Sequence, residues 1–197
     1  MTAHRAHDQR RQATRLTLGA CTVAAVLAGC GGGGDDRLSS ATVAPAAVHL
    51  RVSSPAFIDG ARLQRRYTCD GAGDEPVVRA GGVPAGADEL VLVVSDPDAP
   101  GGTFVHVTRY GLKPGGDGSV DHGGREGRNS AGDDGWTPPC PPDGDGRHRY
   151  VWSVYALRDP TGLPAGAAPA EVTKELDTGL LASGTITATY SRGKDDA

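Results

Sequence analysis

The sequence predicts a mainly β domain with minor α content, and the pattern of its apolar residues carries this prediction. Residues 89–95 form a short continuous apolar run, and residues 149–157 carry apolar side chains at both odd and even positions. A strand that is buried on one face alternates between apolar and polar residues, whereas these two segments leave no side for solvent. We therefore expect both to be central strands of a sheet that is covered on two faces.

A third predicted strand borders water. Residues 185–190 alternate strictly, with Ile186, Ala188 and Tyr190 on one side and three threonines on the other. Because successive side chains of a strand point to opposite faces, this pattern is typical of a strand with one buried and one solvated face.

One helix is expected near the end of the chain. It should begin around Pro169, since proline is well tolerated in the first helical turn. Val172, Leu176 and Leu180 repeat at four-residue spacing, which places them on one stripe that should pack against a sheet. Residues 115–135 contain many glycines and charges and few apolar residues, so we assign them to a long loop.

The amino-terminal segment has the features of an export signal. Four arginines surround a single aspartate ahead of an apolar run over residues 16–28, which is too short to span a bilayer as a stable helix. The run ends in the letters LAGC at residues 27–30, which resemble a bacterial lipobox. We expect residues 1–29 to be a lipoprotein signal peptide and Cys30 to carry a lipid; the alternative is an ordinary signal peptide cut nearby.

The rest of the chain divides into a tether and one domain. Residues 30–46 are rich in glycine and poor in apolar surface, so they should form a flexible tether, and residues 47–193 should form the folded domain. The expected product is an exported bacterial lipoprotein of the cell envelope. Its contact with the membrane would come from the lipid, because membrane affinity grows with the number of buried methylene groups.

The charge balance argues against nucleic acid as a partner. The whole chain has a formal net charge of −4, and removal of the arginine-bearing signal leaves the exported part more acidic. Without a basic patch there are few counterions to release on binding a phosphate polymer. The acidic residues between Asp133 and Asp145 are interpreted as a solvated surface.

The cysteines fall into two groups. Cys21 leaves with the signal and Cys30 would be lipidated, so Cys69 and Cys140 remain in the exported domain. A lone pair of cysteines in an oxidising compartment usually forms a disulfide. We expect this bridge; the alternative is two free or metal-binding thiols.

Aspartates and histidines near predicted strand ends are the candidate site residues. Asp96 and Asp98 directly follow a predicted strand, and their alternate positions allow both to point the same way. His106 lies in the next strand at the same parity as Tyr110. His148 stands at the start of the strand of residues 149–157. If these strand ends converge, carboxylates and imidazoles meet in one polar cavity.

Each of these residues also has a purely structural interpretation. The two aspartates can form a turn whose carboxylates cap backbone amides. His106 and His148, taken singly, are more often structural histidines than ligand contacts. Tyr150 and Trp152 are more often core aromatic residues.

Three ordered motifs decide between these interpretations. The letters YTCDG stand at residues 67–71, DPDAP followed by FVH at residues 96–106, and PPCPP followed by HRY at residues 138–150. Together they resemble the motifs of the phosphatidylethanolamine-binding protein family, the Raf kinase inhibitor-like proteins, over about residues 57–192. Val107 departs from the family pattern, which has tryptophan there, so the pocket wall should be less aromatic.

The resemblance implies a β-sandwich with one helix near the carboxyl end and a small pocket that accepts phosphate, acetate or a phospholipid headgroup. The residues that match the family pocket are Asp96, Asp98, His106, Pro142, His148 and Tyr150, with Asp70 at the rim. A disulfide between Cys69 and Cys140 would frame that pocket.

The implied function is a binding or regulatory module for small anionic or phospholipid-headgroup ligands. No nucleophile stands beside a base in the motifs, and no catalytic residue, cofactor or metal ion is expected. A homodimer is compatible with this function. Family members are described as inhibitors of kinases or proteases, but an exported lipoprotein does not easily meet a cytosolic kinase, and fold-level analogy does not fix function.

Two aspartates beside a phosphoryl group would repel it, so we expect their charge to be used elsewhere. We hypothesise that His106, His148 and Tyr150 donate hydrogen bonds to the phosphate. One of the two aspartates, Asp96 or Asp98, would orient a histidine, and the other would accept from an ammonium group.

Two alternative functions remain open at this point. The first is a metal-assisted phosphohydrolase, in which His106, His148 and Asp96 or Asp98 would hold zinc or iron. The second is a periplasmic protease inhibitor, in which an exposed loop such as residues 123–134 would dock into an enzyme cleft.

Overall fold

The structure is a computed structural model that describes residues 48–193. It confirms a mainly β fold with one α-helix near the carboxyl end. The elements, in chain order, are β1 (Val48–His49), β2 (Arg51–Ser53), the 3₁₀ helix η1 (Arg65–Tyr67), β3 (Arg79–Gly81), β4 (Glu89–Asp96), β5 (Phe104–Leu112), β6 (Arg125–Glu126), β7 (His148–Leu157), α1 (Pro169–Leu176) and β8 (Leu180–Tyr190). The predicted signal peptide, Cys30 and the tether lie outside the described residues.

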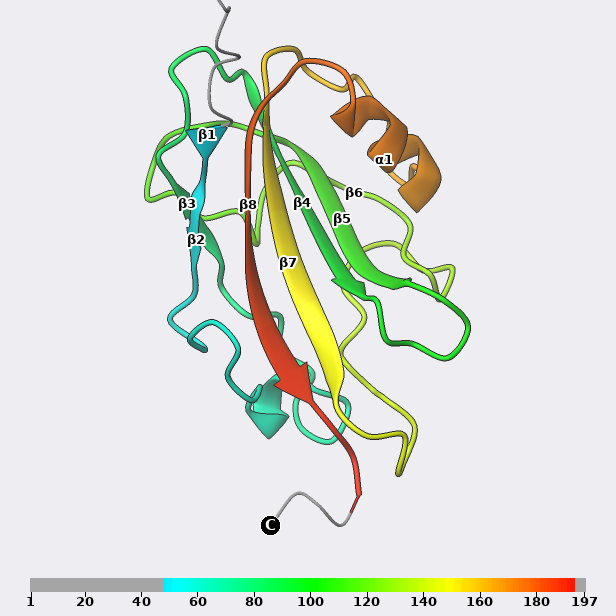
Figure 1. Cartoon of the computed structure of the whole chain (residues 1–197). Helices are drawn as coiled ribbons and strands as arrows, with labels where there is room; N and C mark the ends of the chain where they lie inside the picture. Colours follow the sequence, from blue (N-terminus) through cyan, green and yellow to red (C-terminus); the bar gives the residue numbers. More distant parts are fainter. Residues whose placement is uncertain (1–47, 194–197) are drawn as a thin grey trace, which may run out of the picture. The chain divides into compact units, whose positions relative to one another are not determined.

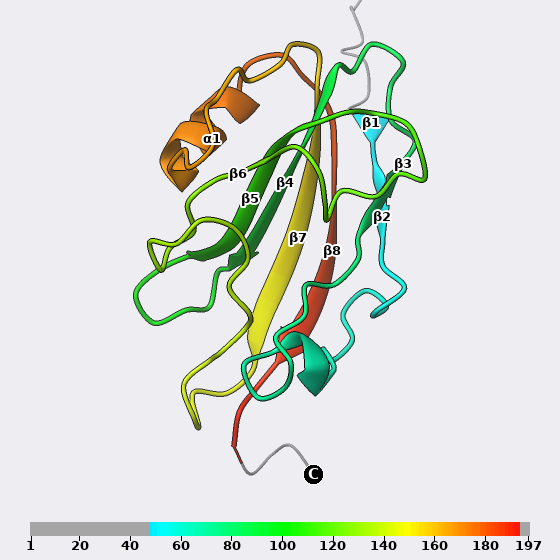
Figure 2. The same ribbon diagram turned by 180° about the vertical axis from the view of Figure 1, so that it is seen from behind.

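Six strands form one sheet in the order β1-β8-β7-β4-β5-β6, and β2 pairs with β3 in a separate two-stranded sheet. Figures 1 and 2 show the large sheet with β2 and β3 beside its β8 side. β4 and β7 lie in the middle of the large sheet, each with a partner on both sides. Both segments that the sequence predicts as central strands are therefore central.

The two faces of the large sheet bury different clusters. Leu90, Leu92 and Trp152 belong to the larger cluster, which includes residues of the small sheet. Val91, between the two leucines, belongs to the other cluster, together with Leu157. Because neighbouring residues of a strand point to opposite faces, β4 is covered on both sides, as its continuous apolar run predicts.

The helix α1 covers one end of the second face. Val172 and Leu176 pack there against residues of β4, β5 and β7. The helix starts at Pro169 as predicted, and the Glu171 carboxylate accepts a hydrogen bond from the backbone N–H of Ala168 at 2.7 Å. The predicted stripe is too long by one turn: α1 ends at Leu176, and Leu180 begins β8 with 48 % of its surface exposed.

β8 alternates as predicted. Ile186, Ala188 and Tyr190 are buried, whereas the three threonines that alternate with them are half-buried or exposed. The expected loop over residues 115–135 is interrupted by β6, which pairs with Arg109 and Tyr110 of β5. A strand of two residues is too short to produce a recognisable apolar pattern, so periodicity does not predict it.

An irregularity in β5 determines which side chains reach the site. Val94 pairs with Val107, but the next residue, Ser95, pairs with Val105, so His106 is an extra residue in β5. Such a β-bulge interrupts the alternation of faces. His106 therefore does not lie on the same face of the sheet as Tyr110, which packs under α1. The two residues have the same parity, but the expectation that they share a face is wrong.

Cys69 and Cys140 form a disulfide, with their Cα atoms 5.4 Å apart and a separation of 71 positions in sequence. The backbone N–H of Cys69 also donates to the carbonyl of Pro139 at 3.0 Å. The bridge joins the segment after η1 to the proline-rich segment that precedes β7. Within residues 48–193, no helix is long and apolar enough to cross a lipid bilayer.

Candidate ligand pocket

A pocket of about 250 Å³ opens where β4 ends, β5 begins and β7 begins. This end of the sheet lies opposite to α1 in both views (Figures 1 and 2). Antiparallel pairing of β4 with β5 and with β7 brings these three strand ends together. The lining residues are Asp96, Ala99, Pro100, Phe104, His106, Thr137, Pro138, Cys140, Pro141, Pro142 and His148.

His148 lies between two carboxylates. Its Nδ1 is 2.8 Å from an oxygen of Asp96, and its Nε2 is 3.3 Å from an oxygen of Asp145. Burial alone would lower the pKa of His148, but the hydrogen bonds and charges of Asp96 and Asp145 outweigh it, so the pKa is raised. Both ring nitrogens face carboxylate oxygens, and the protonated ring, which has a donor on each nitrogen, suits this arrangement.

His106 has the opposite character. Its Nδ1 lies 2.7 Å from the carbonyl oxygen of Thr137, which can only accept, so Nδ1 carries the hydrogen. Burial lowers the pKa of His106, although the Thr137 carbonyl and the charge of Asp96 act against it. The ring is therefore neutral near pH 7, and its Nε2 is a hydrogen-bond acceptor that is buried without a partner among the described residues.

Tyr150 packs against His106. The two ring centroids are 5.3 Å apart in an edge-on arrangement, and Tyr150 itself is not a lining residue. Its hydroxyl is buried and has no hydrogen-bond partner in the described part of the chain. Burial raises the pKa of Tyr150 most, and the charge of Asp96 and a side-chain interaction of the hydroxyl with the Asp96 carboxylate add to it. No hydrogen bond between the two has normal geometry, so the hydroxyl keeps its proton and can donate it to another acceptor.

Asp98 is not brought into the pocket. Its carboxylate accepts from the Arg149 guanidinium at 2.8 and 2.7 Å and from the Arg149 backbone N–H at 2.9 Å. The Arg149 hydrogen bonds lower the pKa of Asp98 to about 2, although partial burial acts against them. This ion pair lies at the surface, and it leaves Asp96 as the single motif aspartate that lines the pocket.

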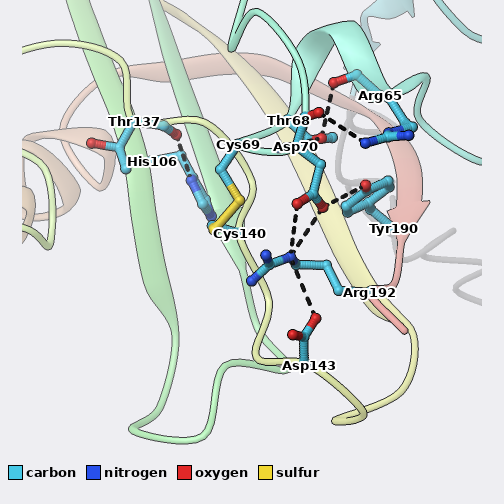
Figure 3. The surroundings of a disulfide bond; sticks show 10 residues. All are labelled: Arg65, Thr68, Cys69, Asp70, His106, Thr137, Cys140, Asp143, Tyr190 and Arg192. Atoms are coloured by element: carbon cyan, nitrogen blue, oxygen red, sulfur yellow. Dashed lines mark hydrogen bonds and ion pairs between the residues drawn. A yellow bond between two sulfur atoms is a disulfide. The ribbon is translucent and has the colours of Figure 1, made fainter. Parts of the chain in front are cut away.

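Asp70 lies in a different hollow, which Arg65 and Arg192 also line. Its carboxylate accepts from the Tyr190 hydroxyl at 2.8 Å and from Nε of Arg192 at 3.0 Å, and these bonds lower its pKa. Figure 3 shows Asp70 on one side of the disulfide and His106 on the other. The bridge therefore lies between Asp70 and His106, while Cys140 forms part of the pocket wall.

Comparison with known proteins identifies the family of this chain. The model for the family described as phosphatidylethanolamine-binding protein matches residues 53–191 of this chain. The chain belongs to the phosphatidylethanolamine-binding protein family.

Relatives of this family in bacteria are similar over most of the domain. LppC of Mycobacterium tuberculosis, whose name marks it as a candidate lipoprotein, is 40 % identical over 170 residues, covering 78 % of this chain and 84 % of LppC. The crystal structure of CT736 from Chlamydia trachomatis, a phosphatidylethanolamine-binding protein homologue, has a TM-score of 0.68 and 31 % identity, covering 73 % of this chain and 98 % of CT736. Escherichia coli YbcL has a TM-score of 0.64 and 26 % identity, covering 73 % of this chain and 99 % of YbcL.

The family motifs miss two contacts that the structure reveals. Asp145 lies between two glycines in an acidic segment, so the sequence pattern reads it as a solvated carboxylate. The carbonyl of Thr137 fixes the tautomer of His106, but a backbone group leaves no trace in the residue type. Val107, the departure from the family pattern, lies in the core and does not line the pocket.

The side chains around the pocket bear on the alternative of a metal site. Within residues 48–193, no three or more histidine, cysteine, aspartate or glutamate side chains form a group that could hold a metal ion. The hydrogen on Nδ1 of His106 is engaged with a carbonyl, and both nitrogens of His148 face carboxylates. These contacts do not favour a shared ligand set of the two histidines.

Proposed function

We propose that this protein is a binding module whose pocket holds the phosphoryl group of a phospholipid headgroup or a similar small anion. One observation carries the proposal: the Nε2 of His106 and the hydroxyl of Tyr150 are buried beside the pocket without partners. Buried polar atoms in proteins nearly always have a hydrogen-bond partner. A bound ligand would supply the partners that these two atoms lack.

The charged groups indicate how an anion would be held. The imidazolium of His148 provides positive charge at the pocket wall, and the Tyr150 hydroxyl provides a neutral donor. Neutral His106 offers an acceptor at Nε2, so an anion bound against it requires a proton on that nitrogen. Binding of a phosphoryl group is therefore accompanied by protonation of His106, which turns Nε2 into a donor.

The size of the pocket limits what enters it. A volume of about 250 Å³ is below the range of about 300–1,000 Å³ that is usual for sites of drug-sized ligands. It accommodates a headgroup and leaves no room for acyl chains. The ligand class that fits is a phosphodiester or phosphomonoester with a small polar substituent.

We further propose that the domain is displayed at a membrane. Residues 1–29 would be removed as a signal peptide, Cys30 would carry the lipid, and residues 30–46 would tether the domain of residues 47–193. The lipobox-like letters, the name of the mycobacterial relative LppC and the disulfide support an exported lipoprotein of the cell envelope. Membrane affinity would then come from the lipid, which leaves the pocket available for its ligand.

A pair of hydroxyl deletions tests the binding role. Tyr150→Phe removes a hydroxyl that makes no hydrogen bond of normal geometry to the described residues, so it should change the free energy of unfolding by less than about 1 kcal/mol while weakening binding of glycerophosphoethanolamine about tenfold. The measurement is titration calorimetry at pH 6, together with urea unfolding of each variant.

Tyr190→Phe is the matched control. It removes a hydroxyl that donates to Asp70, outside the pocket, so it should lower stability by about 1–2 kcal/mol and leave the affinity unchanged. Absence of saturable binding of both glycerophosphoethanolamine and inorganic phosphate to the wild-type protein would overturn the proposed function.

A further inference from the structure

His148 has no ring nitrogen available for an incoming ligand. Asp96 engages Nδ1 and Asp145 engages Nε2. An anion that reaches His148 must therefore share or replace one of these two carboxylates. This inference rests on the proposed function, since it concerns the selectivity of the same pocket.

The Asp145 contact is the more readily replaced of the two. It is longer, at 3.3 Å against 2.8 Å, and the Asp145 side chain is 42 % exposed whereas that of Asp96 is 5 % exposed. Buried pairs in a low-dielectric environment are held more strongly than exposed ones. Asp96 is thus a fixed part of the pocket wall, whereas Asp145 does not line the pocket and reaches it only through its contact with His148.

The backbone around Asp145 suits a carboxylate that changes position. Residues 142–147 are all exposed. Gly144 and Gly146 flank Asp145 with positive φ angles of 78° and 88°, a region that side chains other than glycine rarely adopt. An added Cβ would meet nothing within 4 Å at either glycine. Backbone hydrogen bonds from Gly144 to the Arg192 carbonyl and from Asp145 to the Pro142 carbonyl fix the turn, at 3.1 and 3.2 Å, but no side-chain packing from the described residues surrounds the Asp145 carboxylate.

A carboxylate at this position discriminates between ligands by charge. It repels a bare anion that approaches Nε2 of His148, because two like charges within a few ångströms are unfavourable. A ligand that joins its anion to an ammonium group avoids this repulsion, since the ammonium can receive the carboxylate that the anion displaces from the imidazolium. We propose that Asp145 is a specificity-determining residue, which makes the pocket select zwitterionic phosphodiesters over phosphodiesters without a cationic group.

The test compares two phosphodiesters whose phosphate groups each carry one negative charge. Glycerophosphoethanolamine has an ammonium group and dimethyl phosphate has none. Titration calorimetry at low salt should show that the wild-type protein prefers glycerophosphoethanolamine. In Asp145→Asn the affinity for dimethyl phosphate should rise about tenfold and the preference should be lost, because the repelling charge is gone.

Asp143→Asn is the matched control, since it removes the same charge from the same segment. Asp143 is 76 % exposed on its side chain and lies 3.7 Å from Arg192, away from His148. Its removal should leave the ratio of the two affinities as in the wild type. Urea unfolding of both variants checks that each is folded.

The outcomes separate this role from the proposed function. If no protein of the set binds either phosphodiester, the proposed function fails, and the role of Asp145 with it. If the ligands bind but Asp145→Asn keeps the wild-type ratio of affinities, or Asp143→Asn changes it equally, only the role of Asp145 is overturned.

Discussion

The pKa values of the two pocket histidines shift in opposite directions, and the immediate partners of each ring account for the difference. His148 faces two carboxylates, which stabilise the protonated ring. His106 faces one backbone carbonyl in a buried position, which fixes the tautomer but does not compensate the cost of burying a charge. The residue types alone do not distinguish these two cases, because Asp96 and the Thr137 carbonyl lie 52 and 31 positions in sequence from the histidines that they contact.

Replacing Asp96 should reveal the charge of His148 as a pH-dependent stability. A raised pKa in the folded protein means that the stabilisation is complete below the unfolded pKa of about 6.5 and is lost as pH rises through the folded value. Asp96→Asn should therefore lower the free energy of unfolding by about 1–3 kcal/mol at pH 6 and by less at pH 9. Urea unfolding at the two pH values measures the difference.

Asp98→Asn is the control for this experiment. Asp98 has a pKa of about 2, so it does not titrate between pH 6 and pH 9, and any loss of stability in this variant should be equal at the two values. An equal loss in Asp96→Asn would contradict the assignment of His148 as an imidazolium.

At the level of elements, the sequence predicted what periodicity encodes. The continuous apolar runs identified β4 and β7 as central strands, and the stripe of Val172 and Leu176 identified α1. The bulge at His106 was missed, because an extra residue in one strand is defined by its pairing partner and leaves no period in the sequence.

The sequence predicted part of the candidate site as well. Motif resemblance indicated Asp96, His106 and His148, which do line one pocket. It did not indicate that Asp98 pairs with Arg149, since a surface ion pair between residues 51 positions apart depends on the strand register. The sequence does not predict the role of Asp145, because an acidic residue between two glycines has the pattern of a solvated turn.

The disulfide joins the segment after η1 to the proline-rich segment before β7 and so fixes one wall of the pocket. Replacing both cysteines by serine opens a loop of 71 residues, and the chain-entropy model then gives a loss of about 4 kcal/mol. Cys69→Ser with Cys140→Ser should lower the urea midpoint and weaken ligand binding, because Cys140 lines the pocket. Wild-type protein treated with a thiol reductant should behave in the same way; an unchanged midpoint in both would contradict this prediction.

Both apolar clusters of the domain are built on the strands of one sheet. Leu92 and Trp152 lie on one face, and Val91 and Leu157 on the other, all within β4 and β7. The two clusters cannot separate without breaking this central strand pair, so the domain should unfold in one cooperative step.

This organisation predicts that the proposed domain is autonomous. A protein of residues 47–193 should show the same single calorimetric transition as one of residues 31–193, with melting temperatures within about 2 °C, because the tether has too little apolar surface to add stability. A melting temperature more than about 4 °C lower for the shorter protein would show that residues before 47 contribute to folding.

The extra residue of β5 makes the pocket depend on chain length as well as on chemistry. Excision of one residue between Phe104 and Val107 would restore regular pairing with β4. The imidazole would then alternate to the opposite face of the sheet, where it could no longer line the pocket. A paralogue shortened by one residue before the histidine would keep this residue in its motif and still lack an imidazole in the pocket wall.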